Sequence, residues 1–194
     1  MNTPIYEEAH EGHTIKIYHD TDAESPRDWD NLGTLICGHR RYRLGDDHSH
    51  DDAHTFLRDL SGISHDTDLS VDQLFKRAER HAVILPVYLY DHSGLAMNTS
   101  GFHCPWDSGQ VGFIYATLQT IRKEYGIVRV SAALREKVAA VLKQEVATYS
   151  DYLGGNVYGY VVEDEYEEVD SCWGFIGDYD GYCLEDARAN IPNS

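Results

Sequence analysis

The stretch AVILPVYLYDHSGLAMN occupies residues 82–98 and decides the fold class of this chain. Its first part, 82–90, is the most apolar run in the sequence and predicts a central β-strand. Pro86 lies inside that run, which predicts a bulge or a ladder position that needs no N–H group. The DHSG that follows is a turn sequence, after which the chain returns through 95–98. With a further strand at 111–115, the pattern predicts an antiparallel meander.

The segment 131–153 is the clearest helix in the sequence. Ser131 can cap its first turn, and the Gly154-Gly155 pair can end it. Its apolar side chains recur at helical spacing and form one stripe, which consists of Leu134, Val138, Val141, Leu142, Tyr149 and Leu153.

Shorter elements are predicted on both sides of these two segments. Ser70 and Gln73 form a capping box at the start of a helix that extends to about residue 81. The other predicted elements are strands at 14–18 and 32–37, a helix near 51–60, a hairpin of 157–162 with 169–176, and a terminal helix at 184–189. We therefore expect an α+β fold, with a mostly antiparallel sheet, the long helix on one face and short peripheral helices. Neither a repeat nor a linker is visible, so residues 1–194 are expected to form a single domain.

The composition describes an acidic protein with enough apolar area for a core. The 194 residues include 33 Asp and Glu against 16 Lys and Arg, a formal charge of -17, and 42% of them are hydrophobic. No run approaches the ~18 apolar residues of a membrane span, and the first residues lack the features of a signal peptide. We expect a protein that stays in the cytoplasm, without membrane contact. The four cysteines contain no C-x-x-C and are expected to be free thiols.

The charge balance disfavours direct nucleic-acid binding, because that affinity comes from Lys and Arg. It favours a basic protein surface as partner, and basic grooves are typical of enzymes that process nucleic acid. The alternative, that acidity only confers solubility or suits a salty cytoplasm, stays open at this point.

Two acidic clusters are the candidate partner-binding residues, because a line of carboxylates can imitate the charge of a phosphate backbone. The alternative is a solvated loop and a solvated hairpin tip. The residues are Asp20, Asp22, Glu24, Asp28, Asp30, Glu163, Asp164, Glu165, Glu167, Glu168 and Asp170.

An Asp/His-rich segment at 46–54 provides ligand types that suit zinc or manganese. The candidate ligands are His48, His50, His54 and Asp51, and His50 and His54 would share a helical face. A solvated polar loop is the alternative, so we expect no cofactor, with a divalent metal as the second possibility.

Cys104 is the candidate nucleophile of a thiol enzyme. His92 could act as its base and Asp107 could orient the imidazole. The alternative is a rigid loop without catalytic function. The chain has no G-x-G-x-x-G, P-loop, G-x-S-x-G or H-E-x-x-H motif, so the sequence favours a binding module over an enzyme.

The basic stretch HRRYR at 39–43 could hold a phosphate or a carboxylate, since guanidinium groups pair with both. Alternatively, its arginines pair within the chain with Asp28, Asp30, Asp46 or Asp47.

Several segments together resemble a family of acidic proteins encoded by bacteriophages and mobile elements. They are WDNLG at 29–33, HRRY at 39–42, LYDHSG at 89–94, CPWDSGQVG at 104–112, Y-L-x-G-x-V-Y-G at 152–159 and DSCWGF at 170–175. The resemblance extends from about residue 29 to 178 and implies a phage setting, but it brings no activity, cofactor or catalytic residue.

In such a setting, we expect an accessory protein that binds and inhibits a host nucleic-acid-directed defence enzyme, such as a restriction or CRISPR nuclease. The alternatives are a small metal-dependent or cysteine hydrolase and a structural role in the virion.

Overall fold

The computed structural model describes residues 3–50, 52–64 and 67–191. The chain divides into two compact units: unit 1 contains Met1–Asp28 and Thr148–Ser194, and unit 2 contains Trp29–Ala147. Each unit has one four-stranded antiparallel sheet, which confirms the expected α+β fold and distributes the strands over two sheets. That residues 1–194 form a single domain stays a prediction.

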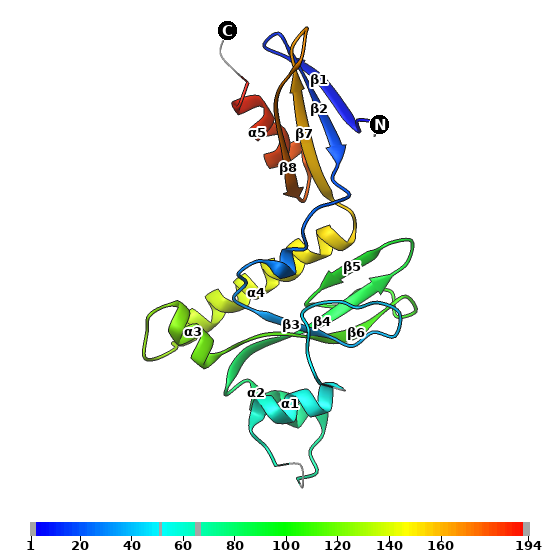
Figure 1. Cartoon of the computed structure of the whole chain (residues 1–194). Helices are drawn as coiled ribbons and strands as arrows, with labels where there is room; N and C mark the ends of the chain where they lie inside the picture. The colour runs from blue at the N-terminus through cyan, green and yellow to red at the C-terminus, as the bar shows by residue number, and fades with distance from the viewer. Residues whose placement is uncertain (1–2, 51, 65–66, 192–194) are drawn as a thin grey trace. The chain divides into compact units, whose positions relative to one another are not determined.

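Unit 1 is built from both ends of the chain. Its sheet has the order β1-β2-β7-β8, with β1 Tyr6–His10, β2 His13–His19, β7 Val157–Glu163 and β8 Glu168–Ile176. Helix α5, Leu184–Ala189, covers one face of this sheet (Figure 1). A short 3-10 turn at Pro26–Asp28 and an irregular turn at Tyr179–Cys183 complete the unit. The hairpin and the terminal helix therefore occur where the sequence predicts them.

Strand β1 is the element of unit 1 that the sequence analysis missed. It pairs with β2 through a two-residue turn in which Glu11 and Gly12 both have positive φ, 46° and 82°. Such turns match the twist of the flanking strands, and Gly adopts this conformation without strain. The Glu-Gly pair is a weaker hairpin signal than Asn-Gly or Asp-Gly.

The core of unit 1 lies between its sheet and α5. Ile15, Ile17, Tyr160 and Val162 alternate along β2 and β7 and are at most 1% exposed. Since side chains alternate along a strand, these residues share one face. They form one apolar cluster with Leu184 and Ala187 of α5.

Unit 2 contains the other sheet and most of the helices. The sheet has the order β3-β6-β4-β5, with β3 Thr34–Cys37, β4 Ala82–Asp91, β5 Leu95–Asn98 and β6 Ser108–Thr117. The helices are α1 Ala53–Ser61, α2 Val71–Ala78, α3 Leu118–Glu124 and α4 Ala132–Leu153, whose residues from Thr148 onward belong to unit 1. Helix α3 follows β6 directly and was not predicted.

The predicted meander is wrong in one pairing. Strand β6 pairs with β3 and with the other side of β4, and not with β5. The reason is length: β5 pairs with four residues of β4, whereas β6 pairs along β4 from Ala82 to Tyr90. The longer ladder forms more hydrogen bonds. The irregularity expected near Pro86 lies between Val87 and Tyr88.

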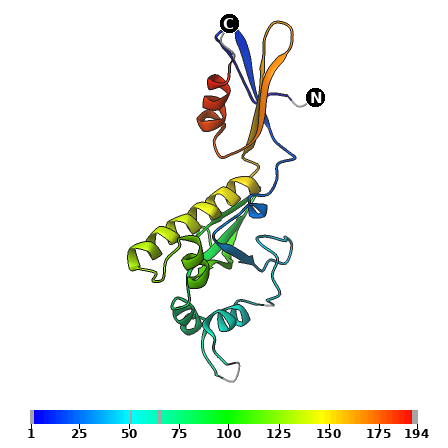
Figure 2. The same ribbon diagram turned by 60° about the vertical axis from the view of Figure 1, so that its left-hand side comes forward.

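Helices cover both faces of the sheet in unit 2. Helices α1 and α2 lie on one face, where Phe56 and Leu74 cluster with Ile36, Ile84 and Phe113 of the strands. Helix α4 lies on the opposite face, as Figures 1 and 2 both show. Its predicted apolar stripe is confirmed in this unit, where Val138 and Leu142 are fully buried, and Ser131 Oγ accepts the Leu134 N–H at 3.2 Å.

Among the residues that the structure describes, no helix combines the length and apolar character needed to cross a membrane. All four cysteines are free, as expected.

Candidate functional site

The two units differ in charge. Unit 1 contains 18 Asp and Glu against 3 Lys and Arg, a formal charge of -15, whereas unit 2 contains 15 against 13, a charge of -2. Nearly all of the net charge of the protein therefore belongs to unit 1, which is the smaller unit.

The tip of the β7–β8 hairpin presents one acidic cluster. Glu165, Glu167 and Glu168 are exposed there and form no ion pair with any residue that the structure describes. Asp164 Oδ1 accepts the N–H groups of Tyr166 and Glu167 at 2.7 and 2.8 Å. These hydrogen bonds, that of Glu167 first, lower the pKa of Asp164 and hold the turn. The exposed carboxylates are thus carried by an ordered turn.

The carboxylates at the base of this tip are engaged within unit 1. Lys16 Nζ lies 2.5 Å from Glu163 Oε2, and this bond raises the pKa of Lys16. Asp170 Oδ2 accepts the Tyr160 hydroxyl at 2.9 Å. Of the six predicted partner-binding carboxylates in the hairpin, Glu163 and Asp170 therefore have internal partners that a ligand would have to displace.

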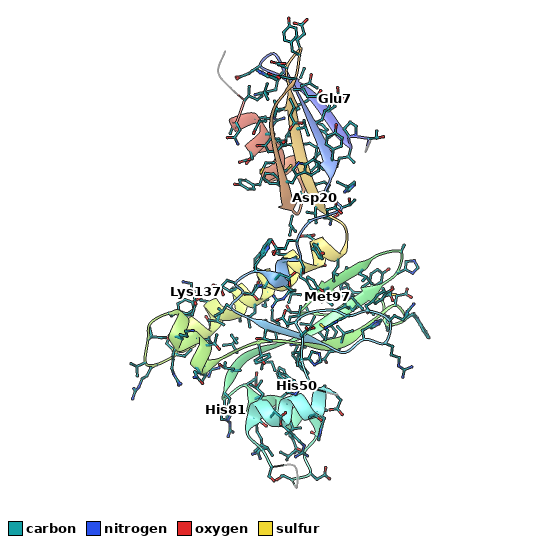
Figure 3. The ribbon with its side chains drawn as sticks, viewed as in Figure 1. Glu7, Asp20, His50, His81, Met97 and Lys137 are labelled. Carbon is teal, nitrogen blue, oxygen red and sulfur yellow. The ribbon has the colours of Figure 1, made fainter. Side chains whose placement is uncertain are left out.

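The second acidic cluster lies at the other end of the same sheet. It follows β2, and the Asp20 N–H donates to the Val157 carbonyl at 2.8 Å, at the start of β7. Glu163 is six residues further along β7, about 20 Å at the usual rise of a strand. Figure 3 marks Asp20 at its end of the sheet. The two acidic clusters of unit 1 thus lie at the two ends of β7. Asp30, which the sequence analysis assigned to the second cluster, belongs to unit 2.

The histidines of the predicted metal site separate in the structure. His48 and His50 line a cavity of about 610 Å³ in unit 2, with their ring centroids 6.1 Å apart. His54 is directed elsewhere, because its Nε2 contacts the Leu69 carbonyl at 3.1 Å and its Nδ1 accepts from Arg58 at 3.4 Å. Asp51 lies outside the described residues. Within residues 3–50, 52–64 and 67–191, no group of three or more His, Cys, Asp and Glu could hold a metal ion.

The three residues of the predicted thiol site lie close together, but the carboxylate and not the imidazole lies next to the thiol. Asp107 Oδ2 lies 3.5 Å from Cys104 Sγ and 3.5 Å from His92 Nδ1, so the carboxylate stands between the thiol and the imidazole. Thiol catalysis needs the base beside the nucleophile, and a carboxylate there repels a thiolate. Elsewhere, burial raises the pKa of Cys183 to about 12, which makes that thiol unreactive.

The arginines of the basic stretch have different surroundings. Arg43 pairs with Asp47, one of the predicted partners, at 2.5 Å, and Arg41 pairs with Asp91, which was not predicted, at 3.0 Å. Arg40 lines the 610 Å³ cavity.

Two features of these sites were missed by the sequence analysis. Tyr166 at the acidic tip is 86% exposed, and Trp106 beside the thiol cluster is 93% exposed. In the sequence, both are aromatic residues within a polar segment, and this pattern could have indicated them. Large exposed aromatic side chains are typical of binding surfaces.

No protein-family model, no curated protein and no solved structure matches the chain. The likeness to phage-encoded acidic proteins therefore stays an expectation.

Proposed function

We propose that this chain is a phage-type acidic accessory protein, which binds and inhibits a host nucleic-acid-directed defence enzyme. Unit 1 is the binding surface, and the target is the basic groove in which a restriction or CRISPR nuclease holds nucleic acid. The observation that carries the proposal is the concentration of charge, -15 in unit 1 against -2 in unit 2. Concentrated charge steers a basic partner to one surface, whereas charge that serves solubility alone needs no such location.

The ordered structure of the hairpin tip supports this proposal. Asp164 fixes the turn, and the Lys16–Glu163 pair ties β7 to β2 below it. A preordered surface loses less conformational entropy on binding than a flexible acidic tail would.

Tyr166 supports it in a different way. It lies among four exposed carboxylates, those of Asp164, Glu165, Glu167 and Glu168, and is itself 86% exposed. Charged groups at a rim mainly set the association rate, whereas buried aromatic anchors contribute most of the affinity. Tyr166 is therefore the residue of the tip that would enter a pocket of the partner.

The second cluster lengthens the surface. About 20 Å separates the two ends of β7, which equals the axial length of about six phosphates on one DNA strand. A groove that holds a short duplex segment is long enough to contact both clusters.

The test is a pull-down with the tagged full chain from bacterial lysate at low and high salt, with captured proteins identified by mass spectrometry. Three chains are compared: the wild type, the tip variant E165Q/E167Q/E168Q, and the control variant E79Q/E124Q/E136Q. The control loses the same charge at exposed positions of unit 2.

We expect a DNA- or RNA-processing enzyme to bind the wild type and the control variant at low salt, and to be lost with the tip variant or at high salt. Equal loss with both variants would show that only total charge matters. Capture of no such enzyme would contradict the proposal for that host.

A further inference from the structure

We infer that the 610 Å³ cavity of unit 2 is a binding site for a small organic anion, a phosphate or carboxylate group on a flat apolar body. The cavity lies where the end of β3, the middle of β6 and the starts of α1 and α2 meet. Its volume is within the range of about 300–1,000 Å³ that is typical of small-ligand sites. Figure 3 marks His50, which lies between α1 and the sheet. The inference does not depend on the proposed function, which concerns unit 1.

Arg40 provides the charge for an acidic group. It lines the cavity and forms no hydrogen bond or ion pair with any other residue that the structure describes. Its neighbours Arg41 and Arg43 are paired with Asp91 and Asp47. Of the three arginines in the basic stretch, Arg40 is therefore the one available to a ligand. Guanidinium groups bind phosphate and carboxylate groups with two parallel hydrogen bonds.

His39 adds a second donor. Its Nδ1 accepts the Arg41 N–H at 3.3 Å, so the neutral ring carries its proton on Nε2. The rings of His48 and His50 are also held by the protein. Nε2 of His48 donates to the Cys37 carbonyl at 3.1 Å, and Nδ1 of His50 lies 3.5 Å from Asp59 Oδ2. Fixed rings form a preorganised wall for a ligand.

The cavity has little acidic character to repel an anion. Asp52 is the one carboxylate among its described lining residues, and it caps α1 by accepting the Thr55 N–H at 2.7 Å. That hydrogen bond lowers the pKa of Asp52, so the carboxylate is ionised. It is held at the N-terminus of α1, where the helix dipole offsets part of its charge. Because unit 2 as a whole has a charge of only -2, its long-range field opposes an anion far less than that of unit 1.

Apolar side chains form the rest of the cavity wall. Ile36, Phe113 and Val71 line it, and Val71 is 44% exposed at the start of α2. Exposed apolar groups beside cationic ones favour a ligand with both characters. The acidic group would contact Arg40 and His39, and a flat body would cover Val71.

The test is calorimetric titration of the full chain with four probes: phenyl phosphate, benzoate, adenosine monophosphate and inorganic phosphate. We expect phenyl phosphate or benzoate to bind at least tenfold more tightly than inorganic phosphate. Whichever of phenyl phosphate and benzoate binds more tightly identifies the acidic group of the ligand. If adenosine monophosphate binds more tightly than both, the flat body of the ligand is that of a nucleotide.

Two variants locate the site. R40Q is expected to weaken binding by tenfold or more, and V71W, a change at an exposed position, is expected to abolish it by filling the cavity. R43Q is the matched control and should bind as the wild type does, because Arg43 is paired outside the cavity. The inference is overturned if none of the probes binds, if R43Q loses as much affinity as R40Q, or if inorganic phosphate binds as tightly as the organic anions. Zinc binding that requires His48 and His50, without anion binding, would also overturn it.

Discussion

The two units of this protein have similar architectures but very different surface charge. Each has a four-stranded antiparallel sheet covered by helix, yet unit 1 has 18 acidic side chains against 3 basic ones and unit 2 has 15 against 13. Unit 2 also contains the cavity lined by Arg40, which has no ion pair with any residue in the described part of the chain. The acidity of the chain is therefore concentrated in one unit, as a binding surface requires and as solubility alone does not.

The largest expected effect is in the sheet of unit 2. A Cβ on Gly112 would lie 1.8 Å from the Ile36 carbonyl oxygen, a backbone atom that cannot move without opening the β3–β6 ladder. We expect Gly112→Ala to cost about 3 kcal/mol or more of the free energy of unfolding, as overpacking and a lost strand pairing combine. Hydrogen exchange by mass spectrometry should show the loss across β3 and β6.

The matched substitution in unit 1 is Gly159→Ala. There the Cβ would meet the Trp173 ring at 2.2 Å, but that side chain is 48% exposed and can rotate outward. The expected cost is about 1 kcal/mol. If Gly159→Ala lowered the free energy of unfolding more than Gly112→Ala does, the explanation that a side chain can move away and a backbone carbonyl cannot would be contradicted.

The next effect concerns an ion pair that holds α5 to the sheet of unit 1. Two nitrogens of Arg188, Nε and Nη2, each lie 2.7 Å from a Glu8 carboxylate oxygen, and Tyr6 donates to the same group. These bonds, that of Arg188 first, lower the pKa of Glu8 to about 2. Because Arg188 is 40% exposed and solvent screens the pair, we expect Glu8→Gln to cost about 1–2 kcal/mol in chemical unfolding at pH 7.

The same pair gives a pH dependence with a defined sign. A carboxyl whose pKa is lower in the folded state stabilises above its unfolded pKa, near 4.5, and that stabilisation is lost as the pH falls toward 2. The difference in stability between wild type and Glu8→Gln should therefore shrink over this range. A difference that stays constant down to pH 2 would show that Glu8 acts through packing alone.

The smallest effect separates the units by charge. Raising NaCl from 0.05 to 0.5 M shortens the screening length severalfold and weakens the repulsion among the carboxylates of unit 1. Since only three cations are available there for attractive pairs, repulsion dominates, and we expect stabilisation of about 1 kcal/mol in unit 1 and less in unit 2. Amide exchange in β7 and β6 measures both within one sample. If salt stabilised both units equally, the two units would not differ in electrostatic repulsion.

The sequence predicted those elements that carry a regular pattern. Helix α4 has an apolar stripe with a cap and a glycine stop, and α2 has its capping box. Strands β7 and β8 flank an acidic turn. Helix α3 was missed because it starts directly after β6, without a break in the apolar sequence.

The division of charge could not be predicted because it is not sequential. Unit 1 joins residues 1–28 to 148–194, and no local pattern indicates that these segments form one sheet. The cavity combines Arg40, His48 and His50 with Val71 and Gln110. The sequence analysis singled out the first three in two separate segments, and did not indicate the last two. Local spacing predicted the residue types of these sites, whereas long-range pairing determined which of them meet.

The most direct test of the proposed function is an inhibition assay with a captured nuclease. Its activity is measured against rising concentrations of nucleic-acid substrate, with wild type, E165Q/E167Q/E168Q or E79Q/E124Q/E136Q added. We predict inhibition by the wild type and by the unit 2 control that excess substrate relieves, and a loss of inhibition of at least tenfold for the tip variant. Inhibition that substrate does not relieve, or that the tip variant retains in full, would contradict the claim that unit 1 occupies the nucleic-acid groove.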